Sequence, residues 1–207
     1  MKKVFLSVLL LFSFVIIANS QETKNTHFVI DWNNGFSKFC NYSGLSNIND
    51  NKESHIGRFM QADVGIIRHE KGGIFLDMEI NDINMRYNEM FNEKCILGYG
   101  GVSLAFIGKV SDKFSIEPRF GCGILSLSNK IYYNDKDYTM NRIGNGCKFS
   151  LLFSYKLLEH LYCGVNGEFF SGHIKNKDLP DELKTYSMNH NNDIYSANLS
   201  IGFRAIF

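Results

Sequence analysis

Ser171 and His173 are the residues whose types and spacing come nearest to a nucleophilic catalytic pair. They stand two positions apart, so in a β-strand both side chains lie on the same face. A histidine that takes the proton of a serine hydroxyl activates it for acyl transfer, provided that a third group orients the imidazole. Because the sequence offers no evident carboxylate for that role, we expect the protein not to be an enzyme.

The five cysteines and six histidines show no pattern for a metal, a redox centre or a cofactor. No C-x-x-C pair occurs, and the histidines lack the spacing of zinc ligands. The glycine-rich stretches at 98–101 and 144–146 lack the full G-x-G-x-x-G spacing of nucleotide-binding loops. We therefore expect no catalytic residues, no metal and no cofactor. A Cys40–Cys95 disulfide stays an open alternative, because both residues fall near predicted loops.

The composition describes one β-rich domain without affinity for nucleic acid. The 207 residues carry 22 Lys and Arg against 21 Asp and Glu, and no long basic run is present. Only 2 prolines stand beside 18 glycines, 18 phenylalanines and 10 tyrosines, which excludes a disordered chain and favours strands over a helical bundle. We expect no nucleic-acid partner.

Residues 1–20 have the pattern of a secretory signal peptide. Two lysines precede an apolar run over 4–17, and small residues at 18 and 20 precede a predicted cleavage before Gln21. The apolar run has about fourteen residues, fewer than the roughly 20 of a membrane-spanning helix, so an uncleaved anchor is disfavoured. The sequence predicts an exported protein whose mature domain covers 21–207.

Eight segments alternate between apolar and polar residues with the period of a β-strand. The last shows it best, because Leu199, Ile201 and Phe203 share one face and small polar residues stand between them. The segments cover about 28–33, 60–66, 74–81, 97–110, 114–124, 147–157, 161–170 and 195–207. Pro118 lacks the N–H that a sheet ladder needs, so we expect a bulge or local irregularity there.

The connections between these segments alternate in length. Short links suited to tight hairpins are predicted at 69–73, 110–113 and 158–160, and long polar loops at about 37–55, 86–94, 129–145 and 175–193. An up-and-down meander follows, with the four long loops at one end and both termini at the other.

The polar faces of the segments carry small residues and charges of both signs. The charged positions are Asp31, Asp63, Asp77, Glu79, Glu117, Glu168, Arg119, Lys148, Lys156 and Arg204. An interior polar network with a structural role is predicted for Glu117, Arg119, Glu168, Arg204, Asp63, Asp77 and Lys148. The apolar faces of the last four segments carry no charge, as expected where Arg or Lys in lipid would cost about 2 to 4 kcal/mol.

Two architectures fit alternation of this kind. In a secreted soluble β-sandwich, acting as a binding module, the apolar faces pack against each other and the polar faces meet water. In a membrane the sheet must close on itself, because lipid cannot satisfy its edge groups. Frequent Ser, Gly and Asn on the polar faces suit a narrow barrel interior and favour the barrel.

The chain ends in Ser200–Phe207, where Gly202 and the terminal Phe207 follow a polar-x-Gly-x-x-apolar-x-aromatic pattern. With the signal peptide and the eight alternating segments, this ending resembles that of small outer-membrane β-barrel proteins of Gram-negative bacteria. The resemblance implies an all-β, eight-stranded antiparallel up-and-down transmembrane β-barrel in the cell outer membrane. Outer-membrane lipid and the barrel assembly machinery are its implied partners. The Asn- and Lys-rich loops resemble those of outer-membrane barrel domains in the Bacteroidetes.

The interior of an eight-stranded barrel is just wide enough to be filled by side chains, so a porin-like open channel is not expected. The role is then structural, or recognition by the extracellular loops of an extracellular ligand or a host surface. The loop aromatics that are candidates for such contact are Tyr132, Tyr133, Tyr138 and Tyr186. We expect a monomer.

One enzymatic alternative follows from the same resemblance. Ser171 and His173 are similar to the Ser/His pair of outer-membrane lipid A deacylases, which use an eight-stranded barrel. The order here is Ser-x-His, whereas that family has His-x-Ser.

Overall fold

The computed structural model describes residues 26–40, 56–69, 71–88, 91–133, 135–175 and 192–207. The predicted signal peptide and Tyr186 therefore lie outside the described residues, as do most of the predicted loops 37–55 and 175–193. Within the described ranges no helix is long and apolar enough to cross a membrane.

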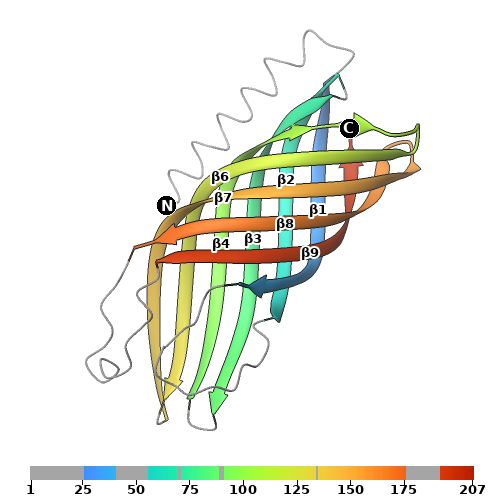
Figure 1. Ribbon diagram of the computed structural model, residues 1–207. Coiled ribbons are helices and arrows are strands. Elements are labelled where there is room, and N and C mark those ends of the chain that lie inside the picture. Colours follow the sequence, from blue (N-terminus) through green and yellow to red (C-terminus); the bar gives the residue numbers. More distant parts are fainter. Residues whose placement is uncertain (1–25, 41–55, 70, 89–90, 134, 176–191) are drawn as a thin grey trace.

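Eight long antiparallel strands and one short strand, counted over the described residues, form a single closed sheet (Figure 1). Their bounds are β1 (Thr26–Phe39), β2 (Ile56–Arg68), β3 (Gly72–Asn88), β4 (Phe91–Phe106), β5 (Gly108–Lys109), β6 (Phe114–Tyr133), β7 (Lys136–Leu158), β8 (Leu161–Ile174) and β9 (Asp193–Ile206). The pairing of β1 with β9 and of β4 with β6 closes the ring. The predicted up-and-down barrel is confirmed.

Pro118 faces an interruption of the neighbouring ladder rather than a bulge in its own strand. The ladder between β4 and β6 stops at the pair Ala105–Arg119, and β5 resumes it in the same register at Gly108–Ile116. At the gap, the backbone N–H of Ile107 bonds instead to the carbonyl oxygen of Lys71, at 2.8 Å. The predicted irregularity therefore lies in the partner strand, opposite the position where proline has no N–H to donate.

Two of the four predicted long loops are wrong. The stretches 86–94 and 129–145 continue as strands, so only residues 89–90 and 134–135 separate β3 from β4 and β6 from β7. At the second turn the last strand pair is Tyr133–Lys136, and Asp135 has a φ of 59°, the left-handed conformation that a tight hairpin requires.

The lengthened strands extend beyond the rest of the barrel. Pairing of β2 with β3 ends at Arg58–Asp82, and pairing of β7 with β8 ends at Gly144–Ile174. Past these points four strands form a sheet, which we call the four-stranded extension (83–88, 91–95, 126–133 and 136–143). Figure 1 shows it protruding from one end, opposite the end where β9 finishes near the C-terminus.

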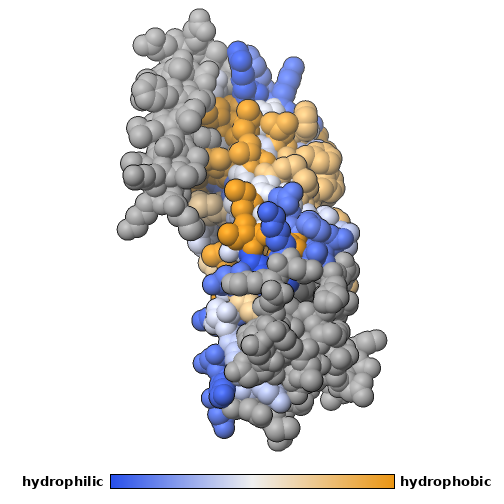
Figure 2. Space-filling model, turned by 90° about the vertical axis from the view of Figure 1, so that its left-hand side faces the viewer, coloured by the Kyte–Doolittle hydropathy of each residue, from blue (hydrophilic) through white to orange (hydrophobic). Residues whose placement is uncertain are grey.

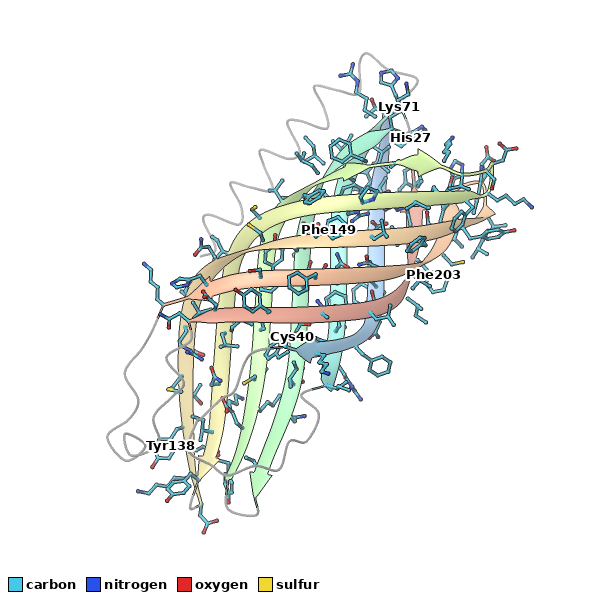
Figure 3. All side chains as sticks on the ribbon, in the orientation of Figure 1. His27, Cys40, Lys71, Tyr138, Phe149 and Phe203 are labelled. Carbon is cyan, nitrogen blue, oxygen red and sulfur yellow. The ribbon has the colours of Figure 1, made fainter. Side chains whose placement is uncertain are left out.

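The outer surface of the barrel is apolar and the inner surface is polar in its middle part. Phe120 and Phe203 are 57% and 59% exposed, whereas Glu117 and Arg204 are 0% and 5% exposed. Figure 2 shows hydrophobic side chains gathered in a band between hydrophilic groups, and Figure 3 shows Phe149 and Phe203 on this outer face. The sandwich alternative is wrong, because a sandwich would bury these rings and expose the charges.

Candidate functional site

Five charged side chains meet in the middle of the barrel, on strands β1, β2, β6 and β9. We call Asp31, Asp63, Glu117, Arg119 and Arg204 the Arg119–Arg204 cluster. Arg119 Nη1 donates to Asp63 Oδ2 at 2.8 Å and its Nε donates to Glu117 Oε1 at 2.5 Å, and Nη2 donates to Asp31. Arg204 Nε donates to Asp31 Oδ1 at 2.7 Å and Nη1 donates to Glu117 Oε2 at 2.6 Å. Each guanidinium thus joins carboxylates from different strands.

A second group gathers around Lys148 on β7, and we call it the Lys148 cluster. The Lys148 ammonium contacts Glu79 and lies 3.4 Å from Asp77 Oδ2 and 3.6 Å from Glu168 Oε2. Ser103 Oγ donates to Asp77 Oδ1 at 3.0 Å. All four charged groups are buried, so these contacts replace the water that the charges give up on folding.

All seven residues predicted for the interior network lie in these two clusters. Asp31 and Glu79 belong there as well, and the same strand alternation had placed them on the polar face. Gln61 joins the groups: it donates to Asp63 Oδ2 at 2.8 Å, and its Oε1 accepts from Asn166 at 3.0 Å. Lys156 lies apart, at a cavity of about 260 Å³ that opens at the short-turn end.

Apolar layers enclose the clusters on both sides. At the short-turn end Val29, Ile67, Phe75 and Ala105 pack together, and the Phe75 ring centroid lies 3.9 Å from Arg119 Cζ. At the other end the packed set is Phe39, Ile83, Cys95, Leu97, Tyr99, Leu125, Leu127, Phe170, Ile174 and Ile194. The charged groups therefore form ion pairs with one another, and apolar side chains cover both clusters at either end. This arrangement is typical of a structural network.

Two aromatic rings meet across the interior within the second apolar layer. Tyr99 on β4 and Phe170 on β8 have ring centroids 5.6 Å apart at 71°. Glycines make the room for them. A Cβ at Gly101 would lie 2.3 Å from the Tyr99 hydroxyl oxygen, and a Cβ at Gly146 would lie 2.6 Å from Phe170 Cζ. The small inward residues of the sequence thus admit large rings rather than leave an open channel.

On the outer face, the structure supplies the carboxylate that the sequence did not reveal beside His173. His173 Nδ1 lies 2.7 Å from Asp193 Oδ1, and the two residues are paired directly across β8 and β9. Ser171 lies on the same face of β8, one residue pair away, and among the described residues no hydrogen bond joins it to His173. Sequence reasoning missed Asp193 because the pairing depends on the register of two strands separated by a long connection.

The predicted loop tyrosines are strand residues wherever the structure describes them. Tyr132 and Tyr133 end β6, and Tyr138 lies near the start of β7, at the far end of the extension (Figure 3). The Tyr132 hydroxyl donates to Asp135 Oδ1 at 2.8 Å, which raises the pKa of the tyrosine. The loop assignment was wrong because the strands continue after the outward apolar residues have ended.

The two residues of the predicted C-terminal assembly signal lie on β9 and immediately after it. A Cβ at Gly202 would lie 2.1 Å from Asn33 Oδ1 on the neighbouring β1, so only glycine fits this approach. Phe207 is 66% exposed on the outer face, and its N–H donates to the carbonyl oxygen of Phe28 at 2.8 Å. The last strand is thereby fixed to the first along the closing seam of the barrel.

The open alternative of a Cys40–Cys95 disulfide is wrong. Neither sulfur belongs to a disulfide, and Cys40 is exposed next to the end of β1, whereas Cys95 is buried on β4. The Cys95 sulfur lies 3.1 Å from Asn129 Nδ2. Since β2 and β3 stand between the two strands, no ladder brings these cysteines together.

Comparison with known proteins identifies the fold of the chain but does not assign it to a family. No family model and no curated sequence matches the chain. Neisserial surface protein A is 15% identical, with a TM-score of 0.52 over 87% of this chain and 97% of that one. Ail of Yersinia pestis is 8% identical, with a TM-score of 0.55 over 88% and 99%. A major outer membrane protein from Thermus thermophilus is 12% identical, with a TM-score of 0.54 over 88% and 99%. The chain therefore has the fold of the small eight-stranded outer-membrane β-barrel proteins.

Proposed function

We propose that the protein is an integral outer-membrane β-barrel with a filled interior, which holds the four-stranded extension outside the cell for surface recognition. The observation that carries the proposal is a change in the outer face along the strands. In the apolar band the outward residues include Met78 and Ile80, and the next outward residue of β3 is Asp82. Asp82 Oδ2 lies 2.9 Å from Lys94 Nζ on β4, and both side chains are exposed. A sheet that passes from lipid into water requires such a change.

The filled interior favours anchoring over transport. Two salt-bridged clusters occupy the middle, and packed apolar side chains close it on either side. We expect no diffusion channel through this interior, because an aqueous pore needs a wider ring of strands.

The extension offers exposed polar and aromatic groups to a partner in the medium. Its outward side chains include Tyr132, Lys130 and Asn141, all exposed. Ail, which shares the fold, is described as an attachment invasion locus protein and has been crystallised with the heparin analogue sucrose octasulfate. That property belongs to Ail, but it supports the idea that a barrel of this shape presents a binding surface. We propose that the chain binds an extracellular ligand or a host surface. We further propose that the barrel assembly machinery is its folding partner and that the chain is a Bacteroidetes-like outer-membrane barrel domain.

Epitope insertion on intact cells tests this orientation. A tag inserted after Asp135, at the tip of the extension, is expected to bind antibody on intact cells. The same tag after Asp112, in a short turn at the opposite end, should bind only after the outer membrane is permeabilised. Equal labelling of both tags on intact cells, or labelling of Asp112 alone, contradicts the proposed topology.

Adhesion of the same cells tests the recognition role. Cells that display Lys130→Ser, Tyr132→Ala protein should lose attachment to epithelial monolayers and heparin-coated surfaces. A matched change at the other end, Lys109→Ser, should leave attachment intact. If cells with the unchanged protein do not attach, or if the unchanged protein and both variants give equal attachment, the recognition role is rejected. The assignment as an outer-membrane barrel is not affected by that result.

A second function, acyl-ester hydrolysis at the lipid interface, is favoured by the His173–Asp193 contact of 2.7 Å. The contact holds Nδ1, so Nε2 is the nitrogen left to take a proton from a serine hydroxyl. Ser171 lies on the same outward face, where the apolar band ends and the lipid head groups would begin. An acyl chain of a neighbouring lipid would reach this face without leaving the membrane.

Lipid analysis tests the hydrolase. Cells that carry the unchanged protein are expected to contain lipid A lacking one acyl chain by mass spectrometry, and Ser171→Ala and His173→Asn should each restore the full set. Ser126→Ala, an outward serine on β6, is the matched control and should behave as the unchanged protein. Lipid A of the same mass with and without the protein rejects this second function.

A further inference from the structure

Cys122 and Cys147 form a pair on the outer face of the barrel. They are directly opposite each other on β6 and β7, and their Sγ atoms lie 2.8 Å apart. Both are exposed free thiols, as are Cys40 and, partly, Cys163. Among the described residues no other two cysteine sulfurs are in contact.

The backbone at this pair already suits a covalent bond. Residues directly opposite in an antiparallel ladder have Cα atoms about 4.5 to 5.5 Å apart. Disulfides span Cα separations of about 4.4 to 6.8 Å, so a bond between these sulfurs requires no movement of either strand. The two residues belong to one hairpin, so they meet as soon as β6 and β7 pair, before the barrel closes.

We propose that Cys122 and Cys147 are joined by a cross-strand disulfide in the exported protein, made by exchange with a protein disulfide oxidant. One chain thiolate attacks the oxidant's disulfide, forms a mixed disulfide and displaces a thiolate. The second chain thiolate then attacks the chain sulfur of the mixed disulfide and releases the oxidant as a dithiol. The chain loses two protons and two electrons, and the two sulfurs of the oxidant gain them.

The surroundings of the pair decide when this exchange occurs. On the same outer face, the next pair along the strands is Phe120–Phe149, with ring centroids 4.8 Å apart, and Val102 lies beside Cys122 on β4. If this face touches lipid, as the proposed function requires, thiolates are disfavoured there and soluble thiols have no access. The disulfide therefore forms on the hairpin before insertion and is protected afterwards. It ties together the two longest strands, which carry half of the extension.

Thiol trapping on the unchanged full chain tests the bond. Cells are quenched in acid, and the protein is denatured and treated with N-ethylmaleimide without a reductant. Peptide mapping is expected to find the Cys122 and Cys147 peptides linked and Cys40 alkylated, the latter serving as the internal control. Alkylation of both Cys122 and Cys147 overturns the proposal.

A second measurement tests whether lipid protects the disulfide from reduction, independently of whether the disulfide forms. In folded protein in lipid vesicles the disulfide should resist a water-soluble phosphine, and after boiling it should be reduced completely. Reduction at the same rate in the folded and the boiled protein overturns the protection by lipid, and with it the lipid contact of this face. The disulfide itself would still be shown by the linked peptide. A Cys122→Ser, Cys147→Ser variant should unfold at a lower urea concentration than the matched control Cys163→Ser.

Discussion

Replacing Arg119 by methionine is expected to destabilise the folded barrel by about 3 to 5 kcal/mol, the usual result of removing one partner from a buried ion pair. Arg119 contacts Asp31, Asp63 and Glu117. Arg204 remains for Asp31 and Glu117, but among the described residues Asp63 has no other ion-pair partner. The variant thus leaves a buried carboxylate with no cation in direct contact and no bulk water.

Urea unfolding in lipid vesicles measures this effect. Trp32, the single tryptophan of the sequence, is 51% exposed on the outer face and reports the loss of the lipid environment by its fluorescence. Arg68→Met is the matched control, because Arg68 is exposed at the short-turn end of β2. Arg119→Lys should recover only part of the stability, since a single ammonium cannot reproduce a planar fork that reaches three carboxylates. A loss in Arg119→Met no larger than that in Arg68→Met contradicts the structural role of the cluster.

The faces of the strands were predictable from the sequence, because a period of two leaves only two choices for each residue. Arg204 lies between Phe203 and Ala205, and once the aromatic residue faces outward the arginine must face inward. The same reasoning places Glu117 and Lys148 inside. It does not say which charge meets which, since that depends on register and on the closing pairs around the ring.

The extension was not predictable by the same pattern. In the barrel proper the outward residues are apolar, but in 129–143 the inward residues Ile131 and Met140 are buried, and the outward residues Lys130 and Asn141 are polar. At these four positions the apolar residues face inward and the polar residues face outward, which is the opposite of the barrel proper and fits surroundings of water in place of lipid. A reading that expects apolar residues outside interprets this stretch as a polar loop.

Contacts between side chains on neighbouring strands were also not predictable from the sequence. The pairs His173–Asp193 and Cys122–Cys147 each consist of residues directly opposite in a ladder. A shift of one residue in either register would separate them and turn one partner to the other face. The sequence therefore left a Cys40–Cys95 disulfide open, because both residues fall near predicted loops, and it did not reveal the two pairs that the sheet brings together.

Replacing Ile201 by arginine is expected to cost about 2 to 4 kcal/mol of folding free energy in lipid vesicles, as a charge near the bilayer midplane does. Ile201 is 70% exposed on β9, between Leu199 and Phe203 on the same outward face. In vesicles its side chain must leave hydrocarbon or draw water into it. We expect a lower urea midpoint by Trp32 fluorescence and less heat-modifiable protein in the outer membrane of the host.

The matched control is Ile143→Arg, which separates contact with lipid from mere exposure. Ile143 is 65% exposed on β7, close to the 70% of Ile201, but its outward neighbours on the strand are Asn141 and Asn145. There we place the sheet beyond the hydrocarbon, so the same substitution should cost about 0 to 1 kcal/mol. If the outer face met water everywhere, two isoleucines of nearly equal exposure would respond alike, and an equal small effect at both positions would contradict the membrane assignment. A large effect at Ile201 alone places the lipid boundary between the positions of the two residues.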